Sequence, residues 1–417
     1  MEKSGKFRLT SLERNWILYD VGNSAFVLMV ATLIPIFFNA LAESGGLSSV
    51  EYLAYWGYAS SAVTVITAVL SPILGTVADT KGFKKPIFIL CVFVGIVGCC
   101  AMGAASAWLP FLVIFVIAKV GFSGSLVFYD SMLSDVTTPE RMDEVSSRGY
   151  AWGYIGSCVP FVVCLGLVLG AGSIGISQMT ALNLALLLTA AWWLLTTLPL
   201  LKSYKQRYYV EVEKHAVRQS FARIGHTLRH LPEDKQVFWF LLAFFCYIDG
   251  VYTIIDMATA YGTALGLDTT GLLLALLVTQ IVAFPSALIF GRLSNKYPSA
   301  KLIPVCIAAY AGIAVFAFFL TRQWQFWVLA VIVGMFQGGV QALSRSHFAK
   351  IIPPEKSGEY FGLFDICGKG ASFLGTMIVS VGSQLTGSAN VGVGSLIVLF
   401  IVGFVLFRVS CRQGETV

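Results

Sequence analysis

Long apolar runs separated by short polar connections fill almost the whole chain. Each run is close to or above the ~20 residues that a helix needs to cross the ~30 Å hydrocarbon core of a bilayer. Because lipid cannot satisfy free backbone groups, we expect every run to form a helix. A transmembrane barrel would require short alternating segments, whereas these runs are continuous. The twelve predicted spans are 15–41, 50–78, 86–105, 109–134, 147–171, 177–200, 236–264, 269–294, 302–320, 324–349, 358–384 and 391–410.

The composition agrees with integration into a membrane. Of the 417 residues, 57% are hydrophobic and only 12% are charged, whereas soluble domains carry roughly 25% charged residues. Of the 28 Lys and Arg, all except Lys119, Arg322 and Lys369 lie at the amino terminus or the carboxyl end, or in the even-numbered connections and the span ends next to them. Because basic residues concentrate in cytoplasmic loops, we expect both termini in the cytoplasm. The net charge of +6 follows from this topology, and we expect no nucleic-acid partner.

One long polar connection, at about residues 201–235, divides the chain. On either side of it, 1–200 and 236–417 each hold six predicted spans. Apolar residues in the connection recur every three or four positions, which predicts an amphipathic helix. Such a basic helix would lie on the cytoplasmic lipid surface; the alternative is a solvated linker helix. Its apolar stripe consists of Val217, Phe221, Ile224, Leu228 and Leu231.

The two halves resemble each other in sequence. T-P-E-R-M-D-E from Thr138 aligns with P-P-E-K-S-G-E from Pro353, 215 residues later. G-T-V-A-D from Gly75 aligns with G-R-L-S-N from Gly291, 216 residues later. Two matches at nearly the same offset indicate an internal duplication. Two six-helix halves that face each other, with a site near the membrane midplane, are an architecture of secondary transporters.

The connection after the second span, G-T-V-A-D-T-K-G-F-K-K-P, resembles the loop signature of the major facilitator superfamily. The residues that match the signature are Gly75, Asp79, Gly82, Lys84 and Lys85. The resemblance implies a cytoplasmic gate that closes when the two halves approach, and Arg148 and Arg345 are further gate candidates. The alternative is a loop that only fixes the topology through its lysines. In the second copy Asn295 replaces the acid, and we expect a weaker contact there.

Four further stretches resemble the vacuole-effluxer branch of this superfamily, which is linked to autophagy in fungi and widespread in bacteria. They are L-Y-D-V-G-N-S-A-F from Leu18, E-V-S-S-R-G-Y-A-W-G-Y-I-G from Glu144, Q-A-L-S-R-S from Gln341 and F-G-L-F-D-I-C-G-K-G from Phe361. The resemblance implies an all-α membrane protein of a bacterial plasma membrane. Its twelve transmembrane helices would form two pseudo-symmetric six-helix bundles, the major facilitator fold. For the fungal vacuolar members the resemblance implies export of amino acids toward the cytosol. This chain departs from the branch's usual residues at Val21, Gly22, Ile248 and Tyr252, which puts a shared substrate in question.

Charged residues inside the predicted spans are candidates for the functional site, because a charge at mid-membrane costs at least about 2.5–3.5 kcal/mol. Asp365 and Lys369 are four residues apart on one helix face, so they form either a neutral buried pair or a substrate contact. Lys119 requires a partner on another helix or a substrate carboxylate. Asp249 has no cation nearby on its own helix and is the first candidate for a protonatable site; the alternative is a hydrogen-bonded structural acid. The charged candidates are Asp20, Lys119, Asp130, Asp249, Asp256, Asp365 and Lys369.

Uncharged polar and aromatic residues complete the candidate site. Gln337, Gln341 and Arg345 are spaced by four and form one polar stripe on the tenth span, where the two amides are candidates for substrate contact. For each such residue, helix packing is the alternative role. The other candidates are Asn23, Trp152, Tyr154, Tyr252 and Gln280.

These features predict a monomeric secondary active transporter that moves a small polar or zwitterionic solute, an amino acid first, by alternating access. Proton coupling through Asp249, Asp20 or Asp365 is part of this hypothesis. The alternatives are efflux of an amphipathic or cationic compound and, in another class, a membrane receptor or scaffold that transports nothing. Residues 362–370 resemble a phosphate loop but have one residue too many and lack the Ser or Thr that binds magnesium. We therefore expect no nucleotide, metal or other cofactor and no enzymatic activity.

Overall fold

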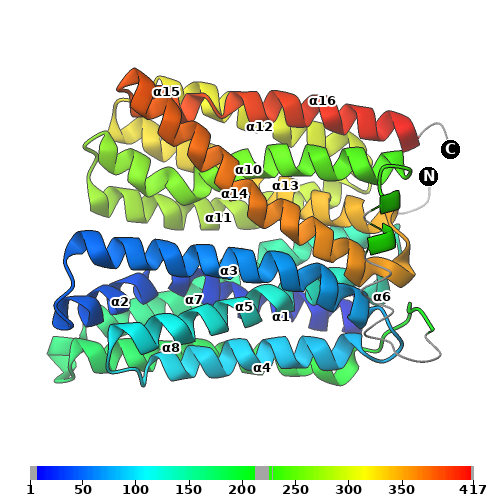
Figure 1. Cartoon of the computed structure of the whole chain (residues 1–417). Coiled ribbons are helices and arrows are strands. Elements are labelled where there is room, and N and C mark those ends of the chain that lie inside the picture. The colour runs from blue at the N-terminus through cyan, green and yellow to red at the C-terminus, as the bar shows by residue number, and fades with distance from the viewer. Residues whose placement is uncertain (1–6, 212–224, 228, 415–417) are drawn as a thin grey trace.

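The computed structural model describes residues 7–211, 225–227 and 229–414, which form the helical bundle of Figure 1. Among these residues, twelve segments are helical and both long and apolar enough to cross a membrane, which confirms the predicted spans. An isolated β-bridge between Thr80 and Val210 joins the loop after the second span to the segment that follows the sixth.

The helix bounds follow the predicted runs closely. In the first half the helices are α1 (Ser11–Ala31), α2 (Leu33–Ser44), α3 (Ser49–Ala78), α4 (Lys84–Met102), α5 (Trp108–Ser131), α6 (Leu133–Val136), α7 (Met142–Leu169) and α8 (Gln178–Ser203). In the second half they are α10 (Lys235–Ala264), α11 (Thr269–Leu293), α12 (Ser299–Phe318), α13 (Gln323–Ile351), α14 (Ser357–Thr386), α15 (Ala389–Gly394) and α16 (Ile397–Gly414). Short 3₁₀ turns occupy Ala171–Ile174 and Pro354–Lys356.

Local chemistry explains where the first span begins and why it is interrupted. The Thr10 hydroxyl accepts a hydrogen bond from the Glu13 backbone N–H, and the Glu13 carboxylate accepts one from the Thr10 N–H. This capping box starts α1 ahead of the apolar run. The span then breaks at Thr32, between α1 and α2. Pro35 explains the break, because it has no N–H to donate to the carbonyl of Ala31, the last residue of α1.

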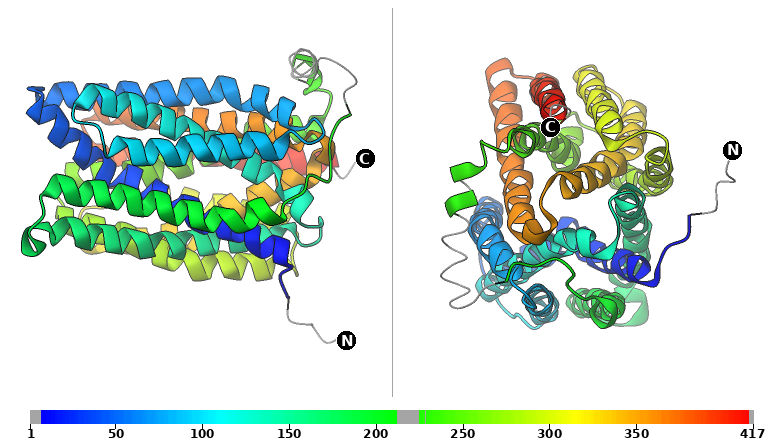
Figure 2. Two further views of the ribbon diagram at one scale, coloured as in Figure 1. Left: turned by 90° about the horizontal axis from the view of Figure 1, so that it is seen from below. Right: turned by 90° about the vertical axis from the view of Figure 1, so that its right-hand side faces the viewer.

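The helices pack as two sets that lie against each other. Figure 1 shows α1–α8 as the lower set and α10–α16 as the upper one, and the end view in Figure 2 shows each set as a cluster of helices. Within the first set α1 packs on α7 and α8, and within the second α10 packs on α14 and α16. Contacts between α3 and α14, and between α7 and both α11 and α13, join the sets.

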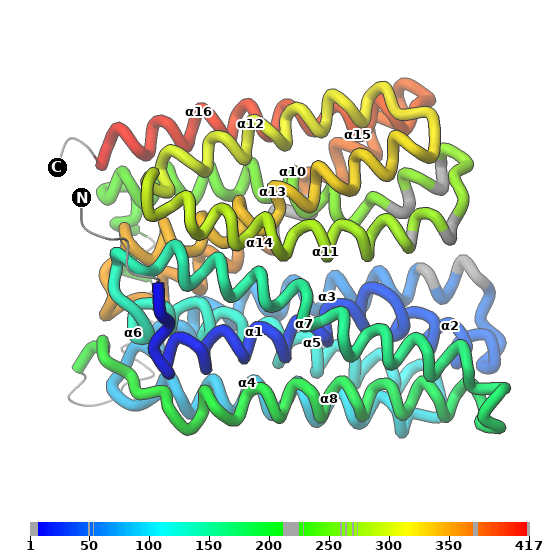
Figure 3. The backbone as a smooth tube through the Cα atoms, turned by 180° about the vertical axis from the view of Figure 1, so that it is seen from behind, coloured from blue at the N-terminus to red at the C-terminus, as the bar shows by residue number. Residues whose placement is uncertain are grey.

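The two sets are sealed at one end of the bundle. Both α1 begins and α16 ends at this end, which we call the termini end (Figures 1 and 3). Residues 71–80 of α3 and the following loop are almost all buried there, whereas Val65 and Val69, closer to the other end, are 63% and 57% exposed. On α14, residues 357–364 are likewise all buried. The halves therefore meet tightly at the termini end.

The linker between the halves is described only in part. Four residues of the predicted amphipathic stripe, namely Val217, Phe221, Ile224 and Leu228, lie outside the described residues. The first part of the linker, Tyr204–Glu211, leaves α8 and runs over the loop between α3 and α4. There the Val210 N–H donates to the Asp79 carbonyl at 2.8 Å, and the Lys81 N–H donates to the Val210 carbonyl at 3.3 Å.

Candidate functional site

Asp79 joins the first half to the second at the termini end. Its carboxylate accepts hydrogen bonds from the backbone N–H groups of Gly358 and Glu359, at 2.7 and 2.8 Å. The N–H groups in the first turn of a helix have no acceptor within that helix, and the helix dipole there also favours a negative charge. Asp79 is fully buried. The loop of the first half thus caps a helix of the second half.

Gly75 permits this contact, because it lies one turn before Asp79 against the α14 backbone. A Cβ atom at Gly75 would lie 2.1 Å from the Gly358 carbonyl oxygen and 2.7 Å from its carbon. Both are backbone atoms, so neither neighbour can rotate out of the way. Only glycine lets the two helices approach closely enough for Asp79 to reach the α14 terminus.

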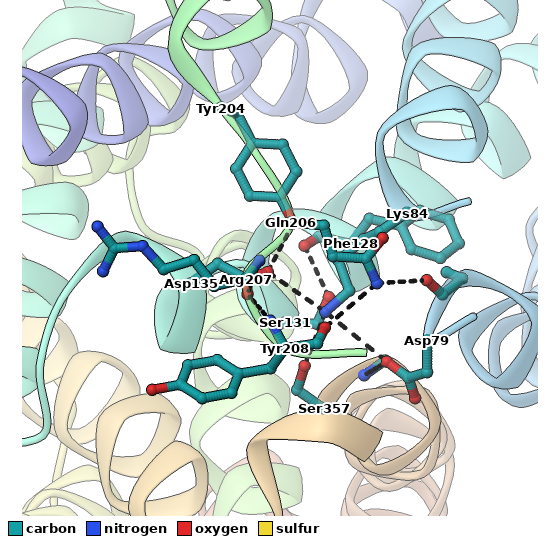
Figure 4. Close-up of polar contacts among 12 residues, drawn as sticks. Asp79, Lys84, Phe128, Ser131, Asp135, Tyr204, Gln206, Arg207, Tyr208 and Ser357 are labelled. Atoms are coloured by element: carbon teal, nitrogen blue, oxygen red, sulfur yellow. Dashed lines mark hydrogen bonds and ion pairs between the residues drawn. The ribbon is translucent and has the colours of Figure 1, made fainter. Parts of the chain in front are cut away.

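Lys84 lies at the centre of the same contact, and both it and the acids around it are buried (Figure 4). Its ammonium group lies 3.7 Å from Asp79 and 3.5 Å from Asp135, and it donates a 2.8 Å hydrogen bond to the Ser357 hydroxyl. Lys84 therefore bridges two acids of the first half and the first residue of α14. We call Asp79, Lys84, Asp135 and Ser357 the gate cluster.

The linker closes over the gate cluster through Asp135 (Figure 4). One Asp135 oxygen accepts a 2.6 Å hydrogen bond from the Tyr204 hydroxyl, and the other accepts the N–H groups of Arg207 and Tyr208, both at 2.9 Å. The predicted gate residues Gly82 and Lys85 also contact the linker. Gly82 N–H donates to the Gln206 side chain at 3.0 Å, and Lys85 donates to the Tyr204 carbonyl at 3.5 Å. The sequence did not identify Asp135, because its only signal is an acid just beyond an apolar run.

Burial raises the pKa of Asp79 to about 6, although the Lys84 ammonium and the two α14 N–H groups oppose the shift. A carboxyl group whose pKa is raised on folding stabilises the folded protein fully when the pH is below the pKa of the unfolded chain, ~3.9. This stabilisation is lost as the pH rises through the pKa of the folded protein. We therefore expect the melting temperature of the wild type, relative to that of Asp79→Asn, to rise between pH 7 and pH 5. Thermal unfolding of both proteins in detergent checks this; a difference that is constant or falls toward pH 5 would contradict it.

The duplicated contact on the other side of the interface uses different chemistry. Gly291 approaches α7, because a Cβ there would lie 2.8 Å from the Ser147 Cβ. The Asn295 side chain donates a 2.7 Å hydrogen bond to the Glu144 carboxylate, rather than capping a helix. Glu144 is the repeat equivalent of Glu359, 215 residues earlier. The predicted gate residue Arg148 binds Glu144 on the same helix at 2.5 Å. Asn295 therefore contacts the repeat equivalent of Glu359, but it binds the side chain, whereas Asp79 binds the backbone N–H of Glu359.

Asp143 adds another link between the halves that the sequence did not suggest. It accepts a 2.6 Å hydrogen bond from the Ser346 hydroxyl and forms a 2.6 Å ion pair with Lys350. Both partners belong to α13 of the second half.

Arg345 is buried at the interface and contacts several elements of the first half. Its guanidinium donates to Asp130 at 2.9 Å and to the hydroxyl and carbonyl of Ser146, at 2.9 and 3.0 Å. Asp20 lies 3.9 Å away. Three aromatic rings surround the guanidinium, with centroids at 4.3 to 5.4 Å, which suits a flat cation. They belong to Trp16, Tyr129 and Tyr150.

The Arg345–Asp130 pair marks the pseudo-twofold axis of the molecule. The two residues are 215 positions apart, which is the offset of the nearby repeat motif. Residues related by a twofold rotation touch each other only next to the axis. The internal duplication has therefore produced an acid and a base at equivalent positions, and they meet where the halves do.

A second charged group lies deeper between the halves. Lys369 and Asp365 form the ion pair that their spacing predicts, at 2.6 Å, and Asp365 also accepts a 2.7 Å hydrogen bond from Ser71 of the first half. Lys119 lies over the ring of Phe122, at 4.8 Å from its centroid. Its charged neighbours across the interface are Lys369 and Asp256. Lys119 thus faces an acid and a base of the other half.

Asp249 is placed differently from the other acids. It is fully buried between α10 and α14, where one oxygen accepts the Gly375 N–H at 2.9 Å and the Thr253 hydroxyl at 3.3 Å. Its other oxygen has no hydrogen-bond partner among the described residues. Among the described residues, both hydrogen-bond donors to Asp249 belong to the second half. Whether Asp249 is a protonatable site or a structural acid stays a prediction.

Several uncharged candidates lie close to these charges. The Tyr154 hydroxyl donates a 2.7 Å hydrogen bond to Gln341 across the interface, and Asn23 donates to the Tyr19 carbonyl at 3.2 Å. Gln337 and Gln280 each have a buried side-chain oxygen without a partner among the described residues. Tyr252 has Asp130, Asp256 and Asp365 as charged neighbours. Among the described residues, Gln337 and Gln280 thus keep an unpaired acceptor, whereas Tyr154, Gln341 and Asn23 have partners.

Trp152 lies on a different face of α7 from Tyr154. An α-helix turns about 100° per residue, so Trp152 points away from Tyr150 and Tyr154, which face Arg345 and Gln341. Trp152 is 46% exposed and packs edge-on against Phe284. Phe284 belongs to α11 of the second half, so Trp152 contacts the interface from a different face of α7, and its contact with a solute stays a prediction.

Comparison with solved structures identifies the fold as that of the major facilitator superfamily. The human organic anion transporter MFSD10 superposes with a TM-score of 0.73 at 15% identity, over 95% of this chain and 99% of that one. FucP, a transporter of the same superfamily solved in its outward conformation, gives 0.71 at 16% identity, over 96% and 97%. This fold and the twelve apolar helices make the protein a multi-pass membrane protein.

The chain belongs to the family described as vacuole effluxer Atg22 like, whose model matches residues 11–139 and 134–416. It is 42% identical to the uncharacterized MFS-type transporter YxiO of Bacillus subtilis (strain 168) over 414 residues, which cover 98% of this chain and 97% of YxiO. Autophagy-related protein 22 of Coccidioides immitis (strain RS) is 25% identical over 315 residues, 65% of this chain and 51% of that protein. The chain therefore spans about half of this fungal relative.

Proposed function

We propose that the protein is a secondary active transporter that works by alternating access. The gate cluster and the Arg345 contacts close the termini end, which carries most of the basic residues and is therefore the cytoplasmic side. The observation that carries the proposal is that these contacts join the two halves, so rocking of one half against the other would break them together. The described conformation is then the one that faces outward.

The solute that fits best is small and zwitterionic, with amino acids first. Lys119 of the first half and Asp256 of the second carry opposite charges toward each other across the interface. A solute with an anionic and a cationic group can bind both and draw the halves together. The partly exposed pair of Asp365 and Lys369 and the amide of Gln280 supply further polar contacts. The resemblance to the fungal vacuolar members, which implies export of amino acids, favours the same class of solute for this protein.

A thermal-shift screen of the purified protein against amino acids, sugars, peptides and organic cations tests the solute class. A solute that binds only the folded protein raises the free energy of unfolding by mass action, by about 2.7 kcal/mol at a hundredfold excess over Kd. The melting temperature rises with it. We expect hits among the amino acids, with the shift reduced in both Lys119→Met and Asp256→Asn. Hits confined to cations, insensitive to Lys119→Met, would instead support efflux of a cationic compound.

A further inference from the structure

The interface at the pseudo-twofold axis holds more acids than bases. Asp20 and Asp130 of the first half surround Arg345, and Asp130 has Asp365 as a further charged neighbour. Asp365 is already neutralised by Lys369 at 2.6 Å. If every group were ionised, three carboxylates would share two cations. The whole group is largely withdrawn from water, since the side-chain exposures range from 2% to 24%.

Asp20 is the acid that lacks a cation of its own. Arg345 donates a hydrogen bond to Asp130 at 2.9 Å but stays 3.9 Å from Asp20. The Asp20 Oδ2 atom has no hydrogen-bond partner among the described residues. The side chain is only 9% exposed. Keeping a carboxylate ionised out of water is costly unless it is both paired and hydrogen-bonded.

No other group around Asp20 supplies the missing positive charge. The titratable and charged groups near it in the described residues are Tyr19 on its own helix, Tyr129 and Asp130 on α5, Tyr150 and Tyr154 on α7 and Arg345 on α13. Four of these are neutral phenols, and one is a second acid. Arg345 is thus the shared counter-ion of two carboxylates.

We propose that Asp20 holds one exchangeable proton while the gate at the termini end is closed, and that it releases this proton when the gate opens. The inference rests on the proposed function and deepens it, because it names the proton as the coupling ion and places its site. The surplus carboxylate of the cluster is neutral in the closed state. In the open state Arg345 withdraws with the second half, water reaches Asp20 and Asp130, and both carboxylates ionise as they do in water.

The location of Asp20 suits coupling better than that of Asp249. Asp249 and all its hydrogen-bond partners belong to the second half, so rigid rocking of the halves leaves its surroundings unchanged. Asp20 and Arg345 belong to different halves, so each gate movement changes the environment of Asp20. The side chains of Asp130 and Asp365 are 21% and 14% exposed, so these two acids would relay the proton between water and Asp20. A proton would enter from the outer side and leave at the termini end.

The release of a proton on opening determines how the closed-to-open ratio changes with pH. If the closed state binds one proton more than the open state, lowering the pH must favour closure, by up to about tenfold in the closed-to-open ratio per pH unit. Asp20→Asn mimics the protonated side chain, so it should favour closure at every pH and remove the pH dependence of the closed-to-open ratio that comes from Asp20. Asp79 contributes equally to the pH dependence of the wild type and of Asp20→Asn, so its contribution cancels when the two proteins are compared.

Spin labels across the gate measure this ratio without any solute. Glu140 and Glu355 are exposed repeat equivalents in the loops before α7 and α14. Both are replaced by labelled Cys in a background in which the partly exposed Cys100, Cys246, Cys367 and Cys411 are Ala. Double electron–electron resonance between pH 8 and 5 then gives the populations of short and long label separations. We expect the short separation to gain population as the pH falls in the wild type, and to be dominant and much less pH-dependent in Asp20→Asn.

Two further variants guard against a merely structural effect. Asp20→Glu keeps the carboxylate and should restore the pH dependence, and Asp249→Asn removes an equally buried acid and should leave it unchanged. An Asp20→Asn protein with the wild-type pH slope would overturn the inference. So would an Asp249→Asn protein that loses the slope while Asp20→Asn retains it. Because the labels report the gate and not transport, these results stand apart from any failure to find a transported solute.

Discussion

Replacing Gly75 by Val is expected to open the termini end and to stop transport while the protein remains folded. A side chain there would meet the Gly358 backbone, with the first carbon only 2.1 Å from the carbonyl oxygen. Overpacking of this kind costs about 1–3 kcal/mol or more, which corresponds to a roughly 5- to 150-fold loss in the closed-to-open ratio. The Asp79 hydrogen bonds to α14 depend on the same close approach, so they are lost together with it.

Gly57→Val is the matched control for Gly75→Val. Gly57 lies on the same helix, and a Cβ there would meet no atom within 4 Å. The same label pair at positions 140 and 355 should therefore show wild-type populations in Gly57→Val and a shift to the long separation in Gly75→Val. Equal populations in the two variants would contradict the assignment of Gly75 to the closed gate.

Replacing Arg345 by Met is expected to cause the largest loss of stability. Removing one partner of a buried ion pair leaves an uncompensated charge and costs about 3–5 kcal/mol. Here the carboxylate of Asp130, which is 21% exposed, would lose its cation, and the buried Asp20 would lose its nearest positive charge. Lys81→Met is the comparison, because the side chains of Lys81 and its partner Glu211 are 61% and 74% exposed. Exposed pairs of that kind contribute about 0.2–1 kcal/mol, so Lys81→Met should melt close to the wild type.

A double-variant cycle distinguishes the ion pair from simple loss of packing. If Arg345 stabilises the fold by neutralising Asp130, Arg345→Met combined with Asp130→Leu should be less destabilised than the sum of the single variants, because no unpaired charge remains at that position. Melting temperatures in detergent measure the four proteins. Additive losses would show that the two residues act independently.

Most of the fold and part of the candidate site could be predicted from the sequence. The spans, their connections and the two-part organisation follow from apolar runs long enough to cross a bilayer, which leave little freedom in lipid. The Asp365–Lys369 pair was predictable because both residues lie on one helix, four positions apart. The exact partner of Asp20 was not, because Arg345 is 325 positions away and only the packing of the halves brings them together.

Other parts of the site depend on the folded arrangement in the same way. Asp135 has no local partner in the sequence, yet in the fold it joins Lys84 to the linker. The sequence identified Asp249 as a protonatable acid because no cation is near it along the chain. Only the fold shows that its hydrogen-bond partners, Gly375 and Thr253, lie within one half. Residue type therefore identified the candidates, whereas the interface between the halves decides their roles.

Counterflow in proteoliposomes tests alternating access most directly. Vesicles that contain the purified protein are loaded with an unlabelled solute that raises its melting temperature, and are then diluted into a trace of the same solute carrying a radiolabel. For alternating access we expect transient accumulation of label with the wild type and with Gly57→Val, and none with Gly75→Val. A wild-type protein that is stabilised by the solute but accumulates no label would contradict it, and would place the protein among receptors or scaffolds that keep the transporter fold.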